Sequence, residues 1–536
     1  MSPPPALKKR AAAAPKVVRV DSKMSIRDLA SLSSSSSSSS DESTAPPPQP
    51  RSNNGGAAAK TMTIKAVARR VANGETLVVY ENKVYNLSLF LKCHPGGDLV
   101  IKHMAGCDAT DEINGLHPQW VIDDRMPRFF IANLVSPQEE DSTTLSDSED
   151  AADDAADAVA EQVKKRRRTR IAYRRLEKKI RDAGLFETNH WYYAAHLVEY
   201  ITFVSIAVLG VVYGTQTWHY MVSAVALGAF WQQSAFTAHD AGHNGITHVR
   251  EYDEKIGIFL GDFCGGLSIG WWKKSHYVHH IATNHPEHDP DIQQLPFFAL
   301  SKRFLTQVHS SYYNKTLVFD DVAKFLIPFQ HLYYYALLCF GRFLLYFLGW
   351  SFVLTEPNYK KRTQEIVGLT FYFCWLGSLV AALPDWKTRV AWVMVSHVST
   401  VFLHIQINLS HFAMSTEDLG KDEPFPCKML RTTMDVDCPW WMDWFHGGLQ
   451  YQAIHHLFPR VPRHNLRKCI PFVKEFADEA GVTYHMYKFV EANGQVFQAL
   501  KDVADQVALM AKVAHHEATA ATGGHHNHHH NHHHHM

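Results

Sequence analysis

Long apolar stretches constrain this chain more than any other feature of its sequence. Several of them approach the roughly 20 residues that a helix needs to cross the hydrocarbon core of a bilayer. The stretches cover residues 200–213, 218–236, 327–350, 366–383 and 390–409. We therefore predict an all-α membrane domain, which we bound at residues 186–488.

The distribution of basic residues predicts the orientation of this domain. The connections at residues 214–217 and 384–387 are short and poor in Lys and Arg, whereas residues 164–181 and 460–468 are rich in them. Because basic residues collect on the cytoplasmic side of membrane proteins, we place the long connecting segments in the cytosol.

The stretch at residues 327–350 differs from the others in its polar and aromatic content. It contains Gln330, His331, Tyr333, Tyr334, Tyr335, Arg342 and Trp350. Residues of these kinds gather where lipid meets water, so we assign the stretch to the membrane interface. Four crossings then remain, as two helical hairpins, and the histidine clusters described below share the cytosolic face.

Composition excludes several classes of function. The 536 residues include 53 basic and 53 acidic side chains, so no field over the whole surface attracts nucleic acid, and we expect no such partner. The eight cysteines include no CxxC pair, which argues against a disulfide scaffold and against a zinc ribbon. The thiols fit a reduced, cytosol-facing protein.

The segments outside the membrane domain are polar or small. Residues 1–60 hold an unbroken serine run and several prolines, so we expect disorder and no secretory signal. Residues 61–135 contain short β-rich runs and are the size of one small α+β domain. Residues 136–185 form a charged linker, and we predict its basic part to be a solvated or membrane-surface helix. Residues 489–536 comprise a C-terminal helix and a solvated histidine-rich tail.

The first candidate site is a pair of histidines in the small domain. His94 precedes Pro95-Gly96-Gly97, which favours a tight turn and lets the backbone approach a flat group, and His117 follows 23 residues later. Two neutral imidazoles on opposite walls of a pocket can ligate haem iron at both axial positions, which permits electron transfer without oxygen binding. A Pro-Gly turn with two incidental surface histidines explains the same residues equally well.

The sequence around these two histidines resembles cytochrome b5. The matching segments are residues 91–98 (LKCHPGGD), residues 106–111 (GCDATD) and His117, within a resemblance that covers roughly residues 61–134. This resemblance implies that haem b binds between His94 and His117 as its axial ligands.

Three histidine clusters form the second candidate site. His239 and His243 stand at i and i+4, on one helical face at the cytosolic end of the second apolar stretch. The other two clusters contribute His276, His279, His280, His455 and His456. Seven imidazoles exceed what one tetrahedral zinc needs and suit two metal ions, although the ligand type is compatible with iron, zinc or copper. A single cluster is typical of a helix end with interfacial histidines, but three on one face favour a metal centre.

Several neighbours of the clusters have two interpretations. Asp240, Asp289 and Asp291 are candidates for hydrogen bonds to the non-ligating ring nitrogens, while residues 287–291 also read as a polar turn. Trp271 and Trp272 either line a lipid entrance or anchor the chain at the interface. We interpret the two remaining histidines nearby as ordinary loop residues; they are His285 and His288.

The spacing HxxxH, HxxHH and QxxHH resembles that of membrane fatty-acyl and sphingolipid desaturases. The leading Gln452, together with an N-terminal haem domain, is typical of the front-end branch of that family. The resemblance implies two non-haem iron ions held by the seven clustered histidines and by one histidine after the last crossing. His411 is our candidate for that ligand and His404 the alternative. An amide is a poorer ligand than imidazole, so we place Gln452 beside a ligand or behind a water molecule of the metal site.

Three longer segments look like fungal sphingolipid 8-desaturases; they are residues 239–248, 270–276 and 284–293. Those enzymes use molecular oxygen to place a trans double bond between carbons 8 and 9 of the long-chain base of ceramide. The resemblance implies a multi-pass protein of the endoplasmic reticulum membrane, with the clusters and the haem domain on the cytosolic side. It also implies electrons from NADH through cytochrome b5 reductase, and the absence of a dinucleotide-binding fingerprint agrees with an external reductase. The sequence is compatible with a homo-oligomer.

Three other functions share part of this pattern. A front-end desaturase of the delta-5 or delta-6 type would use the same metal, electron path and clusters on an acyl lipid. A ceramide fatty-acid hydroxylase also joins cytochrome b5 to histidine clusters, but QxxHH and the long gap at residues 301–451 disfavour it. A haem-carrying membrane protein without catalysis would explain only the first domain.

Overall fold

The computed structural model describes residues 60–135 and 152–523. Four strands in the first range form one sheet in the order β1-β4-β3-β2, with β1 parallel to β4 and the other pairs antiparallel. The strands are β1 (Thr61–Met62), β2 (Leu77–Tyr80), β3 (Lys83–Asn86) and β4 (Phe130–Leu134). Glu81 and Asn82 join β2 to β3 with positive φ angles of 47° and 57°, the geometry that a two-residue hairpin turn prefers.

Helices complete this N-terminal domain. They are α2 (Ile64–Ala72), α3 (Leu99–His103) and α4 (Thr110–Leu116). A small core forms where Val67 of α2 packs on Leu77, Val79 and Val84 of the sheet. The predicted α+β class is therefore confirmed. The preceding segment that we expect to be disordered lies, apart from Lys60, outside the described residues.

The basic segment after the N-terminal domain belongs to α6 (Ala152–Asp182), a helix of 31 residues. The helix is as predicted, but its predicted solvation is wrong for one face. Tyr173, Leu176 and Ile180 are buried in a core shared with α20 (Arg463–Ala480). These apolar residues recur at helical spacing and form a stripe, but the many charged residues between them make the stripe hard to detect in the sequence.

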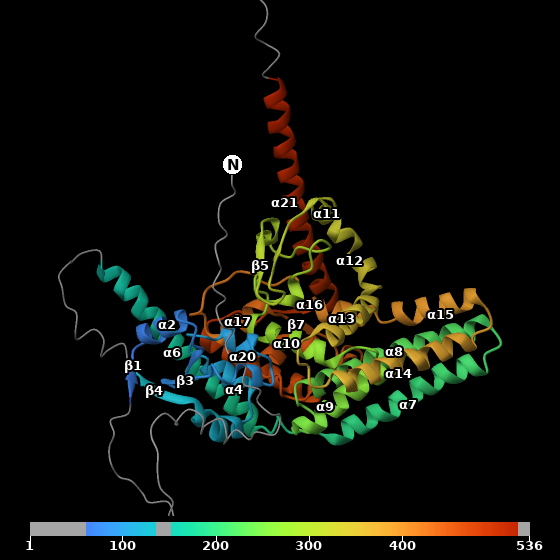
Figure 1. Cartoon of the computed structure of the whole chain (residues 1–536), viewed down its shortest axis with the longest axis horizontal. Coiled ribbons are helices and arrows are strands. Elements are labelled where there is room, and N and C mark those ends of the chain that lie inside the picture. Colours follow the sequence, from blue (N-terminus) through green and yellow to red (C-terminus); the bar gives the residue numbers. More distant parts are fainter. Residues whose placement is uncertain (1–59, 136–151, 524–536) are drawn as a thin grey trace, which may run out of the picture. The chain divides into compact units, whose positions relative to one another are not determined.

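The apolar stretches form helices that pack together. They are α7 (His190–Val212), α8 (Thr217–Gly242), α14 (Arg362–Ala382), α15 (Trp386–Val398) and α16 (Val401–Leu409). In Figure 1, α7, α8 and α14 run side by side, and α8 also contacts α15. Within the described residues, three segments are long and apolar enough to cross a membrane, namely His190–Val212, Arg362–Ala382 and Trp386–Leu409.

The second predicted crossing corresponds to α8, which is 26 residues long but is not among these three segments. Its C-terminal half carries Gln232, Gln233 and His239, and most of that half is buried inside the protein. Polar groups satisfied inside a helical bundle lower the hydropathy of a helix without excluding it from the membrane. Four crossings therefore remain a prediction.

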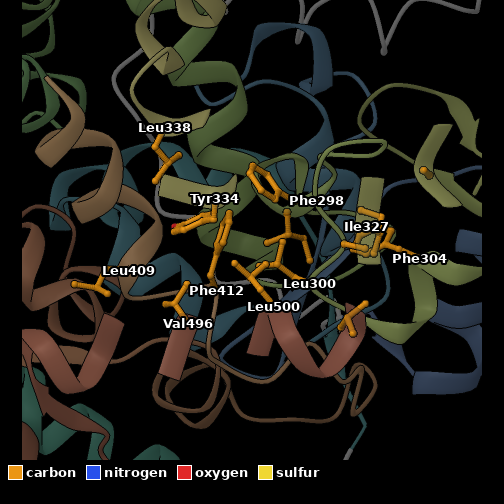
Figure 2. Close-up of a cluster of buried hydrophobic side chains, with 14 of the residues drawn as sticks. Phe298, Leu300, Phe304, Ile327, Tyr334, Leu338, Leu409, Phe412, Val496 and Leu500 are labelled. Carbon is orange, nitrogen blue, oxygen red and sulfur yellow. The ribbon is translucent and has the colours of Figure 1, made fainter. Parts of the chain in front are cut away.

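The stretch that we assign to the interface forms α12 (Gln330–Leu338) and α13 (Gly341–Thr355) after a short α11 (Asp321–Leu326). The segments Asp321–Leu338 and Gly341–Thr355 are bent by 82° at their break, so they do not form one straight crossing. A buried cluster fixes the first half of this stretch, as Figure 2 shows: Tyr334 and Leu338 pack with Phe412, Val496 and Leu500. The last two belong to α21 (Phe489–Gly523). The histidine-rich tail beyond it lies outside the described residues.

Shorter elements connect the long helices. They are α9 (Arg250–Ile258), α10 (Ile269–Ala282), β5 (Val308–Ser310), β6 (Lys315–Leu317), α17 (Phe425–Thr432), β7 (Asp435–Asp437), α18 (Asp443–His446), α19 (Gln452–Leu457) and β8 (Met486–Lys488). The strands pair as β5 with β6 and β7 with β8. All eight cysteines are free.

Candidate metal and haem sites

The first histidine cluster lies where α8 ends. His239 is in the last turn of the helix and His243 is its C-terminal capping residue. The helix stops there because Asn244 adopts a positive φ of 55° and Gly245 N–H returns to the carbonyl of Asp240. The two imidazoles thus leave one helix end together, with ring centroids 4.9 Å apart.

The second cluster lies on α10. The Ser268 hydroxyl caps this helix by accepting from Trp271 N–H at 3.0 Å. From this start, His276, His279 and His280 fall on one face and are all buried. The Nε2 atoms of His276 and His280 lie 3.1 Å apart.

The third cluster lies on the short helix α19, which the chain enters through two residues with positive φ, Gly447 and Gly448. Phe236 of α8 packs so closely on Gly447 that an added Cβ would lie 2.0 Å from its ring. Asp435 of β7 accepts from Ala453 N–H at 2.7 Å and from the Tyr484 hydroxyl. These contacts fix the start of the helix, and with it the direction of His455 and His456.

The structure brings the three clusters together in two groups. Potential ligand atoms within each group all lie within 4.8 Å of one another; the groups are His239, His243, His276 and His455, and His279, His411 and His456. His280 lies between them, with ring centroids 4.8 Å from His243 and 4.2 Å from His456. His411 thus joins the second group, whereas His404 packs against Gly341 and belongs to neither.

The donor set fits metal ions. The Nε2 atoms of His239, His243, His455 and His456 are buried and have no hydrogen-bond partner within the described part of the chain. A buried imidazole nitrogen without a partner is costly unless a ligand satisfies it. Burial, reinforced by neighbouring histidines, also holds the pKa of His455 and His456 well below the ordinary value, which favours the neutral form that binds metals.

Acidic residues near the clusters play different parts. Asp289 accepts from His279 Nδ1 at 2.9 Å, and also from the N–H groups of Asn284 and Asp291. Asp240 does not orient a clustered histidine, contrary to one of our two interpretations, because its carboxylate lies 4.0 Å from His239 Nδ1. Arg463 and Tyr193 bind that carboxylate instead, at 3.0 and 2.7 Å.

Two residues near the clusters, Trp272 and His288, have contacts that the sequence did not indicate. Trp272 stacks on His276 with ring centroids 4.4 Å apart, so it covers a candidate ligand. His288 stacks on His103 of the N-terminal domain at 4.5 Å, and both rings bind the Ser311 hydroxyl. Aromatic and histidine residues without regular spacing give no sequence signal for such contacts.

A small cavity adjoins the first histidine group. Its lining includes Phe236, His239, Gln452, His455 and Arg463. Gln452 is buried and lines this cavity together with His239 and His455.

The histidine pair of the N-terminal domain forms a second, separate site. The rings of His94 and His117 face each other with centroids 6.0 Å apart. Each Nδ1–H donates to a backbone carbonyl, His94 to Gly97 at 3.0 Å and His117 to Ile113 at 3.1 Å. Both Nε2 atoms are thereby left for one iron between the rings, and burial lowers the pKa of both imidazoles, that of His117 to about 4. The pair fits axial ligation of haem.

Comparisons with known proteins agree with both sites. The family described as cytochrome b5-like heme/steroid binding domain matches residues 63–135, and the fatty acid desaturase family matches residues 216–488. The chain is 40% identical to a Delta 8-(E)-sphingolipid desaturase of Emericella nidulans, over 82% of this chain and 94% of that protein. It is 39% identical to the protein of the same name from Komagataella phaffii, over 83% of this chain and 94% of that protein. The chain is 34% identical to Delta(8)-fatty-acid desaturase 1 of Arabidopsis thaliana, over 83% of this chain and 94% of that protein. A haem-binding fold, histidine clusters on a helical membrane domain and these relatives together show that the chain belongs to the family of membrane fatty acid desaturases with an N-terminal cytochrome b5-like domain.

Proposed function

We propose that this protein desaturates the long-chain base of ceramide, forming a trans double bond between carbons 8 and 9. The observation that carries this proposal is the joint occurrence of a bis-histidine haem pocket and two histidine groups in one chain. The fungal relatives, which are named for sphingolipid desaturation and match more than four fifths of the chain, supply the substrate class.

The chain's own residues have separable tasks in this proposal. His239, His243, His276 and His455 would hold one iron ion, and His279, His411 and His456 would hold the other, while His280 lies between the two groups. Such an iron pair supplies, with molecular oxygen, an oxidant strong enough to attack an unactivated methylene group, and the haem delivers electrons singly. Gln452 borders the cavity beside the first group and orients a ligand or a bound water.

Partners and location follow from the same chemistry. Electrons come from NADH through a separate cytochrome b5 reductase, because the sequence has no dinucleotide-binding fingerprint. The substrate enters from the bilayer. We place the protein in the endoplasmic reticulum membrane, with the clusters and the haem domain on the cytosolic side.

A front-end desaturase acting on an acyl lipid is the second candidate, since it would use the same two sites. The plant relative named Delta(8)-fatty-acid desaturase 1 keeps this candidate open. Lipid mass spectrometry of a yeast host that lacks long-chain-base unsaturation distinguishes the two. We expect the wild-type chain to produce an unsaturated long-chain base, and His94→Ala and His279→Ala to abolish it. Saturated long-chain bases together with new double bonds in supplied fatty acids would favour the second candidate.

A further inference from the structure

The second histidine helix contacts both candidate sites. His276, His279 and His280 of α10 face the histidine groups, while Val278 and Ile281 are buried on the other side of the helix. Those two residues pack into a cluster that also contains Tyr85, Val100 and Ile101 of the N-terminal domain. One helix therefore carries candidate metal ligands on one face and contacts the haem domain with the other.

Tyr277 lies where these two faces meet. A methyl group added to Gly96 would lie 3.1 Å from His94 Cε1 and 3.4 Å from Tyr277 Cδ2, so Gly96 lies beside both rings. On its other side, the Tyr277 ring lies 5.9 Å from that of His243, and its hydroxyl donates to the carbonyl of Gly242 at 2.6 Å. The tyrosine thus touches the loop of a haem ligand and the end of the helix that carries the first histidine cluster.

A second aromatic contact also joins the N-terminal domain to the membrane domain, but its residues do not reach the histidine groups. His103 stacks on His288, and His288 stacks on His285 at 4.2 Å. His285 then faces Asp418 at 3.3 Å. None of these three histidines belongs to any of the three candidate metal groups found among the described residues.

We propose that Tyr277 is the bridge through which electrons pass from the haem to the metal pair, by way of His94, Gly96 and His243. This inference rests on the proposed haem and iron sites. In each transfer the ferrous haem is oxidised to the ferric state and the metal pair gains one electron. The tyrosine makes and breaks no bond and keeps its phenolic proton, because its ring only fills the space between donor and acceptor. Electron transfer slows steeply when such a gap is left empty.

Three variants of the full-length protein, loaded with haem and iron in lipid discs, test this inference. Tyr277→Leu removes the ring, Tyr277→Phe keeps it, and Tyr312→Leu is the matched control. Tyr312 packs against the same buried cluster as Tyr277, but its ring contacts the adjacent Tyr313 and Lys274 instead of a clustered histidine. The haem is reduced anaerobically with NADH and reductase, the sample is mixed with oxygen and ceramide, and the Soret band is followed.

We expect Tyr277→Leu to slow haem reoxidation about tenfold or more, while the two other variants stay within about twofold of wild type. Haem content, iron content and the rate of haem reduction by the reductase should be unchanged in all three. Wild-type reoxidation in Tyr277→Leu would overturn the inference, as would equal slowing in Tyr312→Leu, which would assign the effect to domain docking. If ceramide does not accelerate reoxidation even in the wild type, the proposed function fails instead.

Discussion

His279 Nδ1 donates to a buried Asp289 carboxylate oxygen at 2.9 Å, while the same carboxylate accepts from two backbone N–H groups. Asp289 is fully buried, so these hydrogen bonds are the ones that stabilise its charge. The arrangement favours a proton on His279 Nδ1 and leaves Nε2 as the ring nitrogen available to a metal in the group with His411 and His456. Burial alone would lower the pKa of His279, but Asp289 and Asp291 raise it to about 9.

Replacing this carboxylate should weaken iron binding. In Asp289→Asn, the amide no longer offers a charged acceptor to His279, and loss of such a partner typically costs about 10- to 100-fold in metal affinity. Iron per haem, measured in the purified protein after dialysis against a chelator, should fall. Asp418→Asn is the control, because its carboxylate faces His285 at 3.3 Å and belongs to no candidate metal group among the described residues. Equal iron retention in Asp289→Asn and wild type would contradict this role.

The two sites should be separable. His117→Ala removes one axial ligand, so we expect loss of the bis-histidine haem spectrum with iron content at the clusters unchanged. His280 lies between the two histidine groups, so His280→Ala should lose iron at the clusters and keep the bis-histidine haem spectrum. Absorption spectra and metal analysis of the same samples check both results. Loss of haem and iron together in either variant would indicate general misfolding rather than two independent sites.

Asp435, which fixes the third cluster, should make stability depend on pH. Burial raises the pKa of its carboxyl group to about 7, despite hydrogen bonds that favour the charged form. The folded protein thus holds this proton between the ordinary carboxyl value and about pH 7, whereas the unfolded chain does not. Stability should therefore fall as pH rises through this window. An asparagine at position 435 does not titrate. The thermal midpoint of Asp435→Asn minus that of wild type should therefore be larger at pH 8 than at pH 5.5. A difference that does not change with pH would contradict the assignment.

Breaking the buried ion pair between Arg463 and Asp240 should lower the free energy of unfolding. Both side chains are at least nine-tenths buried, and the guanidinium lies 3.0 Å from the carboxylate. Arg463→Met would leave an uncompensated buried charge, which typically destabilises a protein by about 3–5 kcal/mol. The matched control is Arg175→Met, which breaks an exposed pair with Glu479 and should change stability by less than about 1 kcal/mol. Similar thermal midpoints for the two variants would contradict this account.

The candidate sites could be predicted from the sequence because their geometry is local. Histidines at i, i+3 and i+4 share a helical face wherever the helix lies, and His94 and His117 carry a specific surrounding motif. The grouping of His411 with His279 and His456 depends on tertiary packing, so the spacing of residues in the sequence does not predict it.

Contacts between distant segments could not be predicted in this way. The apolar stripe of α6 is interrupted by many charges, so its burial against α20 has no clear signal in composition. The partner of Asp240 is Arg463, more than 200 residues later in the chain, and no spacing rule joins them. Trp272 likewise has a typical interfacial sequence context, yet it stacks on His276.

The most direct test of the central claim locates the double bond made by the purified protein. The full chain in lipid discs receives NADH, cytochrome b5 reductase, oxygen and a ceramide whose long-chain base is saturated, and the product is cleaved with ozone and analysed by mass spectrometry. We expect fragments that place one double bond between carbons 8 and 9 of the long-chain base, and no unsaturated product when oxygen is left out. A double bond in the fatty acyl chain, a hydroxylated product, or no product from protein that retains haem and iron would contradict it.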